Sequence, residues 1–223
     1  MPVAVKTCGL SDRRAVDAAV HGGARFLGFV FFPPSPRDVS PEHAAALAAD
    51  LPAGTATVGV VVDPDNDFIE GILSHMRLDY IQLHGNESPA RADAIRTRTG
   101  CRIIKAISVS DAADIDRAED YRESADLILF DAKASADATR PGGNAQAFDW
   151  RLFQAAPPPA TGWLLSGGLD AGNVGEAIRI TGARAVDVSS GIEAAPGRKD
   201  PEKIGAFLAA AAAAGQAADG AAA

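Results

Sequence analysis

The sequence predicts an α/β fold, a single (β/α)8 TIM barrel, from three observations. The chain has 223 residues, enough to bury the core of one large domain. Eight short apolar runs rich in β-branched residues recur along it, and most are apolar throughout, as strands of a parallel sheet covered on both faces are. Stretches with helical signals lie between many of these runs, and this alternation is typical of parallel strands joined by helices.

Each predicted strand is bounded by a glycine, a proline or a polar residue. In chain order the runs are 3–8, 25–31, 56–62, 79–84, 102–107, 125–131, 162–167 and 184–191. Eight such units match the barrel, although the chain is somewhat shorter than the typical length of about 250 residues. A doubly wound open sheet is the alternative. It usually has fewer strands, and "CGLSD" follows the first strand in place of the Gly-rich dinucleotide fingerprint.

Helices are predicted where a capping residue precedes a periodic or Ala-rich stretch. These stretches are 12–24, 40–51, 86–100, 110–124 and 200–214. Ser40 and Asp200 each precede a proline that suits the first helical position. The third stretch begins at Asn86 or Ser88 and ends at Gly100.

One barrel domain is predicted to cover residues 1–210. The Ala-rich segment 211–223 has little to bury, and we expect a low-complexity tail whose end frays. The long segment 133–150 contains Gly142 and Gly143 and is predicted to be a mobile active-site loop.

Composition and charge exclude several classes of function. The formal net charge of −8 argues against a nucleic-acid or anionic-membrane partner, because phosphate-rich surfaces require a basic face. Two cysteines make no disulfide framework, the N-terminus lacks a secretory signal, and no apolar run approaches a membrane span of about 20 residues. We therefore expect a cytoplasmic protein that binds a small molecule. The four histidines lack ligand spacing, so no metal site is predicted.

The residues that close the strands are the catalytic candidates, because barrel enzymes carry their active sites at the carboxyl ends of the strands. Cys8 closes the first strand and Asp131 the sixth, three steps apart around a closed ring. A thiolate and a carboxylic acid facing each other could act as base and acid on a sugar-sized substrate. A thiolate at neutral pH needs support, for which Lys6 is a candidate. Cys101 begins the fifth strand and is predicted to be structural.

The loops after the last two strands carry small residues, namely Gly167, Gly168, Ser190 and Gly191. Such residues expose backbone N–H groups that could hold a phosphate. Alternatively, the glycines only permit tight turns.

Three further polar residues are candidates for substrate contacts. Arg37, in a proline-rich loop, either holds a carboxylate or is a solvated surface charge. His84 either lines the mouth or is a satisfied strand-end histidine. Asp187 alternates with Val186 and Val188, which places it on the opposite face, a candidate for the barrel interior.

Motifs at nearly every predicted strand end cover the chain except its Ala-rich tail. They read "VKTCGL", "FLGFVFFPPSPRDVSPEHA", "VGVVVDPD", "IQLHGNESP", "LILFDAK", "PGGNAQAFDW", "LLSGGLDAGNV" and "VDVSSGIEAAPGRKD". Together they resemble the phosphoribosylanthranilate isomerase family of tryptophan biosynthesis.

The resemblance implies an Amadori rearrangement of N-(5-phosphoribosyl)anthranilate to 1-(2-carboxyphenylamino)-1-deoxyribulose 5-phosphate, without metal or organic cofactor. It implies Cys8 as general base, Asp131 as general acid and Arg37 as partner of the anthranilate carboxylate, with phosphate at the last two loops. It is compatible with a monomer or a homodimer. Ala145 and Gln146 stand where a further small, flexible residue is expected, which bears on loop flexibility and not on the reaction.

Other functions remain as alternatives. The histidine-pathway isomerase performs the same rearrangement with two aspartates, the first of which would replace Cys8. Ribulose-phosphate epimerases need metal-binding histidines at strand ends, and "FFPP" follows the second strand here. A non-catalytic phosphosugar-binding subunit would be expected to lack Cys8 or Asp131, and a thiol-redox role would need a second cysteine near Cys8.

Overall fold

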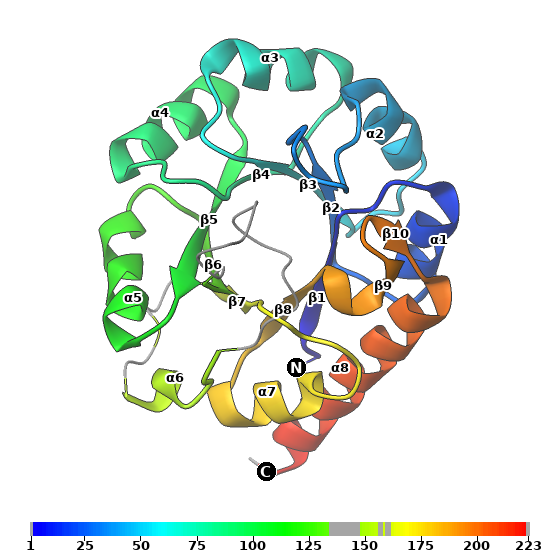
Figure 1. The fold of residues 1–223 in the computed structure, drawn as a ribbon, viewed down its shortest axis with the longest axis vertical. Helices are drawn as coiled ribbons and strands as arrows, with labels where there is room; N and C mark the ends of the chain where they lie inside the picture. The colour runs from blue at the N-terminus through cyan, green and yellow to red at the C-terminus, as the bar shows by residue number, and fades with distance from the viewer. Residues whose placement is uncertain (1, 134–147, 156–157, 159–161, 222–223) are drawn as a thin grey trace.

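The computed structural model describes residues 2–133, 148–155, 158 and 162–221, and within them the predicted barrel is confirmed (Figure 1). Eight parallel strands close into a ring in chain order, the last pairing with the first. They are β1 (Ala4–Cys8), β2 (Phe26–Val30), β3 (Ala56–Val61), β4 (Tyr80–Leu83), β5 (Arg102–Val109), β6 (Leu127–Ala132), β7 (Trp163–Leu165) and β8 (Ala185–Val188). Each overlaps a predicted run, and the closed ring rules out the open sheet.

Helices surround the ring of strands (Figure 1). They are α1 (Arg13–His21), α2 (Pro41–Ala48), α3 (Asn66–His75), α4 (Pro89–Thr99), α5 (Ala112–Asp116), α6 (Leu152–Ala155), α7 (Val174–Thr181) and α8 (Pro201–Ala221), with two 3-10 turns, η1 (Arg117–Tyr121) and η2 (Ser190–Ile192). The hydroxyls of Ser40 and Ser88 accept hydrogen bonds from first-turn N–H groups, and Asp200 does the same for α8. Gly100 ends α4 with a φ of 70°, which glycine adopts without strain.

Strand register separates an inner from an outer set of side chains. Partners in neighbouring parallel strands share a face, so Lys6 lies on the same face as Phe26 of β2 and Asp187 of β8. Toward the amino ends of the strands this inner face is an apolar cluster of Phe26, Val58, Tyr80, Ile104, Ala106, Leu129 and Leu164. Toward the carboxyl ends it becomes polar. The outer face packs against the helices, with Val16 and Ala19 of α1 fully buried.

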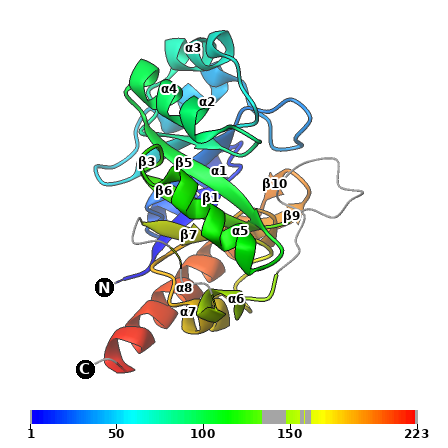
Figure 2. The ribbon, with the colours of Figure 1, turned by 90° about the vertical axis from the view of Figure 1, so that its left-hand side faces the viewer.

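Some elements differ from the sequence expectations. Residues 110–124 divide into α5 and η1, and α3 and α7 lie in stretches for which no helix was predicted. Helix α8 continues past residue 210, where the tail was predicted to begin. Ala211 is buried, and a Cβ at Gly215 would lie 3.0 Å from the backbone nitrogen of Val3. The first part of the predicted tail is therefore a helix packed on the barrel, beside α7 (Figure 2).

Three other expectations concern loops and termini. The predicted mobile loop 133–150, with Ala145 and Gln146, lies outside the described residues except at its ends. Cys101 is buried just before β5, and its thiol donates to the carbonyl of Leu78, as its predicted structural role requires. In the part of the chain that is described, no helix is long and apolar enough to cross a membrane.

Candidate active site

One pocket opens at the carboxyl ends of the strands, a space of about 830 Å³ that includes a part open to solvent. Eight of the nine predicted site residues line it: Cys8, Arg37, His84, Asp131, Gly167, Gly168, Asp187 and Ser190. The ninth, Gly191, does not. Val30, Phe32 and Val60 form an apolar side next to Cys8. Within the described ranges, no group of three or more His, Cys, Asp or Glu side chains is placed to hold a metal ion.

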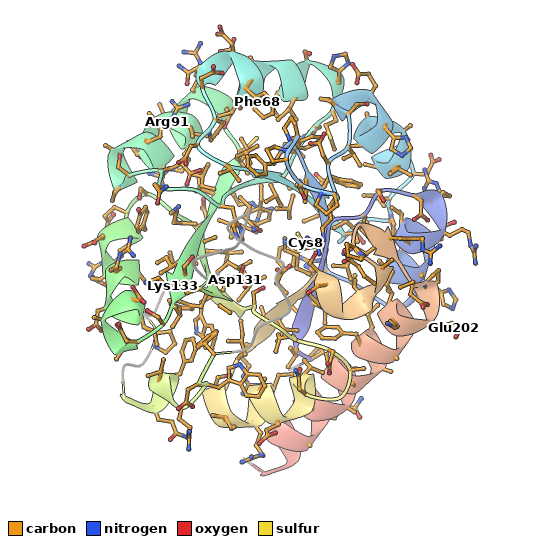
Figure 3. All side chains as sticks on the ribbon, viewed as in Figure 1. Cys8, Phe68, Arg91, Asp131, Lys133 and Glu202 are labelled. Atoms are coloured by element: carbon orange, nitrogen blue, oxygen red, sulfur yellow. The ribbon has the colours of Figure 1, made fainter. Side chains whose placement is uncertain are left out.

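Cys8 and Asp131 line the pocket from opposite sides of the barrel, as Figure 3 shows. They belong to β1 and β6, which are three steps apart around the ring. Both side chains are largely buried. A small molecule bound between them would meet a thiol on one side and a carboxyl group on the other, as the sequence predicts.

Two contacts orient the carboxyl group of Asp131. Its Oδ1 accepts a hydrogen bond of 2.9 Å from the N–H of Ala132, and its Oδ2 lies 3.4 Å from Nε2 of His84. The amide nitrogen of Gln82 donates to Nδ1 of His84 over 2.8 Å. This arrangement leaves the ring proton on Nε2, where it faces the carboxyl group. His84 therefore lines the mouth and contacts the candidate acid.

A buried ion pair forms the floor beneath Cys8. Nζ of Lys6 donates to Oδ1 of Asp187 over 2.7 Å, and Oδ2 of Asp187 accepts from the hydroxyl of Ser166 over 3.0 Å. Burial alone would lower the pKa of Lys6, but Asp187 and Cys8 together outweigh this effect and the pKa is raised well above its ordinary value. Lys6 is therefore a fixed cation, and Asp187 lies in the barrel interior.

The Cys8 thiol experiences opposing influences. Burial raises its pKa and the neighbouring ammonium group of Lys6 acts to lower it, but the Asp187 carboxylate also raises it, and the net pKa is raised. Gly28 on β2 leaves room for both groups, because a Cβ there would lie 3.1 Å from Sγ of Cys8 and 3.3 Å from Nζ of Lys6. The thiol and the ammonium group are thus close neighbours.

Arg37 is not a solvated surface charge, since only 4% of it is exposed. Its Nε and Nη2 donate to the two carboxylate oxygens of Glu193, over 2.6 and 2.9 Å. Its stem packs on Gly9, where a Cβ would lie 2.7 Å from Cδ of Arg37. The guanidinium group lines the pocket, and the carboxylate that the structure places against it belongs to the protein.

The loops after β7 and β8 pass close to other backbone segments, and this closeness requires glycine. Gly167 has a φ of 89°, and a Cβ there would lie 2.6 Å from the nitrogen of Ala132; at Gly191 it would lie 2.0 Å from the carbonyl oxygen of Leu169. Four backbone N–H groups find no acceptor among the described residues, those of Gly167, Gly168, Ser190 and Gly191. The glycines therefore permit tight turns, and the same loops carry N–H groups of the kind that can hold an anion.

Sequence reasoning missed Glu193 and Lys199. They belong to a hairpin between β8 and α8, formed by β9 (Glu193–Ala195) and β10 (Arg198–Lys199). Both side chains are buried, and Nζ of Lys199 donates to Oε1 of Glu193 over 2.9 Å. The available signal was the segment "EAAPGRK", in which opposite charges flank a Pro-Gly turn.

The family model for N-(5'phosphoribosyl)anthranilate (PRA) isomerase matches residues 5–210. The chain belongs to this family. The N-(5'-phosphoribosyl)anthranilate isomerase of Paramagnetospirillum magneticum is 52% identical over 211 residues, which cover 95% of this chain and 98% of the relative. The family and the enzyme class predicted from the sequence are confirmed.

Two solved structures show the same fold. A phosphoribosyl anthranilate isomerase in complex with reduced 1-(o-carboxyphenylamino)-1-deoxyribulose 5-phosphate matches with a TM-score of 0.80 at 37% identity, covering 94% of this chain and 98% of that chain. A monomeric form of the dimeric Thermotoga maritima isomerase matches with a TM-score of 0.79, also at 37% identity and with the same coverage.

Proposed function

We propose that this chain catalyses the Amadori rearrangement of N-(5-phosphoribosyl)anthranilate to 1-(2-carboxyphenylamino)-1-deoxyribulose 5-phosphate in tryptophan biosynthesis. The observation that carries the proposal is the placement of Cys8 and Asp131 on opposite sides of one pocket. Family membership and the product analogue bound to a structural relative support the same reaction.

In the proposed mechanism Asp131 is the general acid and Cys8 the general base. Asp131 protonates the furanose ring oxygen, the C1–O bond breaks, and the anilino nitrogen forms a Schiff base with C1. The Cys8 thiolate then removes the proton from C2. The electron pair of the C2–H bond forms the C1=C2 double bond of an enolamine, which tautomerises to the ketone. One acid and one base are sufficient for these steps.

The remaining pocket residues suit the parts of the substrate. Arg37 would contact the anthranilate carboxylate from the position that Glu193 fixes. The apolar side made by Val30, Phe32 and Val60 suits the aromatic ring. His84 and Asp187 are proposed to contact the sugar.

The phosphate would accept hydrogen bonds from the two loops that close the pocket, at Gly167, Gly168, Ser190 and Gly191. Beyond this small-molecule substrate we propose no partner except a second copy of the chain: it is either a monomer or a homodimer, and the Thermotoga maritima relative is dimeric.

A coupled assay tests the proposal. Phosphoribosylanthranilate is generated in situ, and the loss of its fluorescence is followed with and without this protein. We expect loss that depends on enzyme concentration, with the carboxyphenylamino product identified by mass and by its retention time against a standard. Fluorescence that decays at the uncatalysed rate would refute the proposal.

A further inference from the structure

A continuous chain of buried and partly buried contacts connects Arg37 with the loop after β8. Glu193 accepts from Arg37 over 2.6 and 2.9 Å and from Lys199 over 2.9 Å. Nζ of Lys199 also donates to the backbone oxygen of Ser189 over 2.8 Å and to its Oγ over 3.1 Å. That Oγ donates in turn to the carbonyl of Cys8 over 3.1 Å. The β9–β10 hairpin therefore links the loop after β2, which carries Arg37, with the loop after β8.

The turn of the same hairpin lies against the loop that carries Arg37. Gly197 has a φ of 79°, and a Cβ there would lie 2.2 Å from the carbonyl oxygen of Pro36. The stem of Arg37 rests on Gly9 from another side. Backbone packing and the ion pair with Glu193 thus fix the guanidinium group together.

The charges in this chain depend on one another. Burial alone would raise the pKa of Glu193, but Arg37 and Lys199 hold it below its ordinary value. Because a buried charge without a partner is costly, Glu193 keeps its two cations in place and they keep it ionised. Movement of Glu193 would remove the carboxylate that both cations share.

We propose that Glu193 and Lys199 are positioning residues. They hold the Arg37 guanidinium group and the loop at Ser189–Ser190 at a fixed separation, and so select ligands that carry both a carboxylate and a phosphate. This inference rests on the proposed function, in which Arg37 meets the carboxylate and the loop after β8 meets the phosphate. Neither residue lines the pocket, so both act through other groups.

The test compares binding of two product analogues by calorimetry. One is the reduced carboxyphenylamino deoxyribulose phosphate, and the other is its phenylamino counterpart, which lacks the carboxylate. Wild-type protein should prefer the carboxylated analogue. Glu193→Gln should reduce that preference about tenfold, and in turnover raise KM far more than it lowers kcat. A role in folding alone would lower the active fraction and leave both the preference and KM unchanged.

Lys203→Met is the matched control. Nζ of Lys203 donates to the backbone carbonyl of Glu193 over 2.8 Å, so the variant removes a contact to the same hairpin without touching the ion pairs. It should keep the wild-type preference. If Glu193→Gln fails to fold, Lys199→Gln is measured in the same way.

The outcomes separate this inference from the proposed function. Wild-type protein that does not turn over phosphoribosylanthranilate would refute the proposed function. Active wild-type protein together with folded Glu193→Gln or Lys199→Gln of unchanged preference would overturn the positioning role alone.

Discussion

Nζ of Lys6 lies 2.7 Å from Oδ1 of Asp187 in the floor of the pocket. Lys6 precedes Cys8 by two residues in β1. Residues two apart in a strand share a face, so a fixed ammonium group lies next to the thiol. Its charge favours the thiolate and opposes the effect of burial. Lys6 therefore offsets part of the effect of burial and of the Asp187 carboxylate, which together still leave the pKa of the thiol raised.

Replacing Lys6 should raise the pKa of the Cys8 thiol further. Lys6→Met alone leaves Asp187 buried and unpaired, which costs about 3–5 kcal/mol of stability, so the informative variant is Lys6→Met combined with Asp187→Asn. In a Cys101→Ala background, the pH profile of alkylation by iodoacetamide should move to higher pH. An unchanged profile in the folded double variant would contradict a net lowering of the thiol pKa by Lys6 and Asp187 together.

Gly28 should be required for activity because of the space it leaves. In Gly28→Ala the new methyl group lies 3.1 Å from Sγ of Cys8 and 3.3 Å from Nζ of Lys6, so one of them must shift. We expect kcat to fall by about tenfold or more, since small misplacements of catalytic groups are costly. Gly71→Ala is the control, because a Cβ at Gly71 meets nothing within 4 Å. Equal kcat for both variants would contradict this prediction.

Much of the fold can be predicted from local signals, because a short stretch of neighbouring residues indicates each barrel strand and each predicted helix cap. The run 56–62 predicts β3 from β-branched residues alone, and Ser88 predicts the start of α4 from one hydroxyl. For the β9–β10 hairpin only the Pro-Gly turn is a signal, since its strands have three and two residues and little apolar pattern. The sequence predicts α8 only to residue 214, while the helix continues to Ala221, and an Ala-rich stretch does not reveal which of its residues are buried, as Ala211 is.

The site was predictable only in part for a related reason. Closing the barrel brings all strand ends together, so a cysteine and an aspartate at such ends had to share one pocket. The pairing of the buried charged side chains could not be predicted from the sequence, because Arg37 and Glu193 are 156 residues apart and Lys6 and Asp187 are 181 residues apart. Such pairings are set by packing of the finished barrel.

Acidification should remove the stabilisation that Glu193 provides. Its pKa in the folded chain lies below its ordinary value of 4.5, so its contribution is present above that value and is lost as pH falls through the folded pKa. On going from pH 7 to about pH 3, wild-type protein should lose more unfolding free energy than Glu193→Gln. Urea denaturation at both pH values measures this.

A matched control uses an exposed glutamate. Glu176 has a side chain that is 63% exposed, so Glu176→Gln should follow the wild-type pH dependence within error. If Glu193→Gln also follows it, the buried pairing does not contribute to acid sensitivity.

The packed part of α8 beyond residue 210 should respond to polar substitution as a core does. Ala211 is fully buried and Ala213, in the same helix, is exposed. Ala211→Asp should lower the unfolding free energy by about 2–4 kcal/mol because it buries a carboxylate. Ala213→Asp should change it by less than about 0.5 kcal/mol. Denaturant unfolding distinguishes this from a tail, in which both variants would behave alike.

Cys8 and Asp131 should each be necessary, because ring opening and deprotonation at C2 are consecutive steps and the two residues lie on opposite sides of the pocket. Cys8→Ser leaves a poor base, since a hydroxyl ionises far less readily than a thiol. Asp131→Asn keeps the shape and removes the transferable proton. Each variant should lose about 10²- to 10⁴-fold in kcat, while circular dichroism and binding of the reduced product analogue change little.

Cys101→Ser is the control for the loss of a thiol, because Cys101 lies just before β5, at the amino end of the strands and away from the pocket. It should retain kcat. If Cys8→Ser retained kcat as well, the base would be another group. Asp187 would be the next candidate, because its carboxylate lines the same pocket and lies close to Lys6. Asp187→Asn would then have to lose the activity that Cys8→Ser keeps.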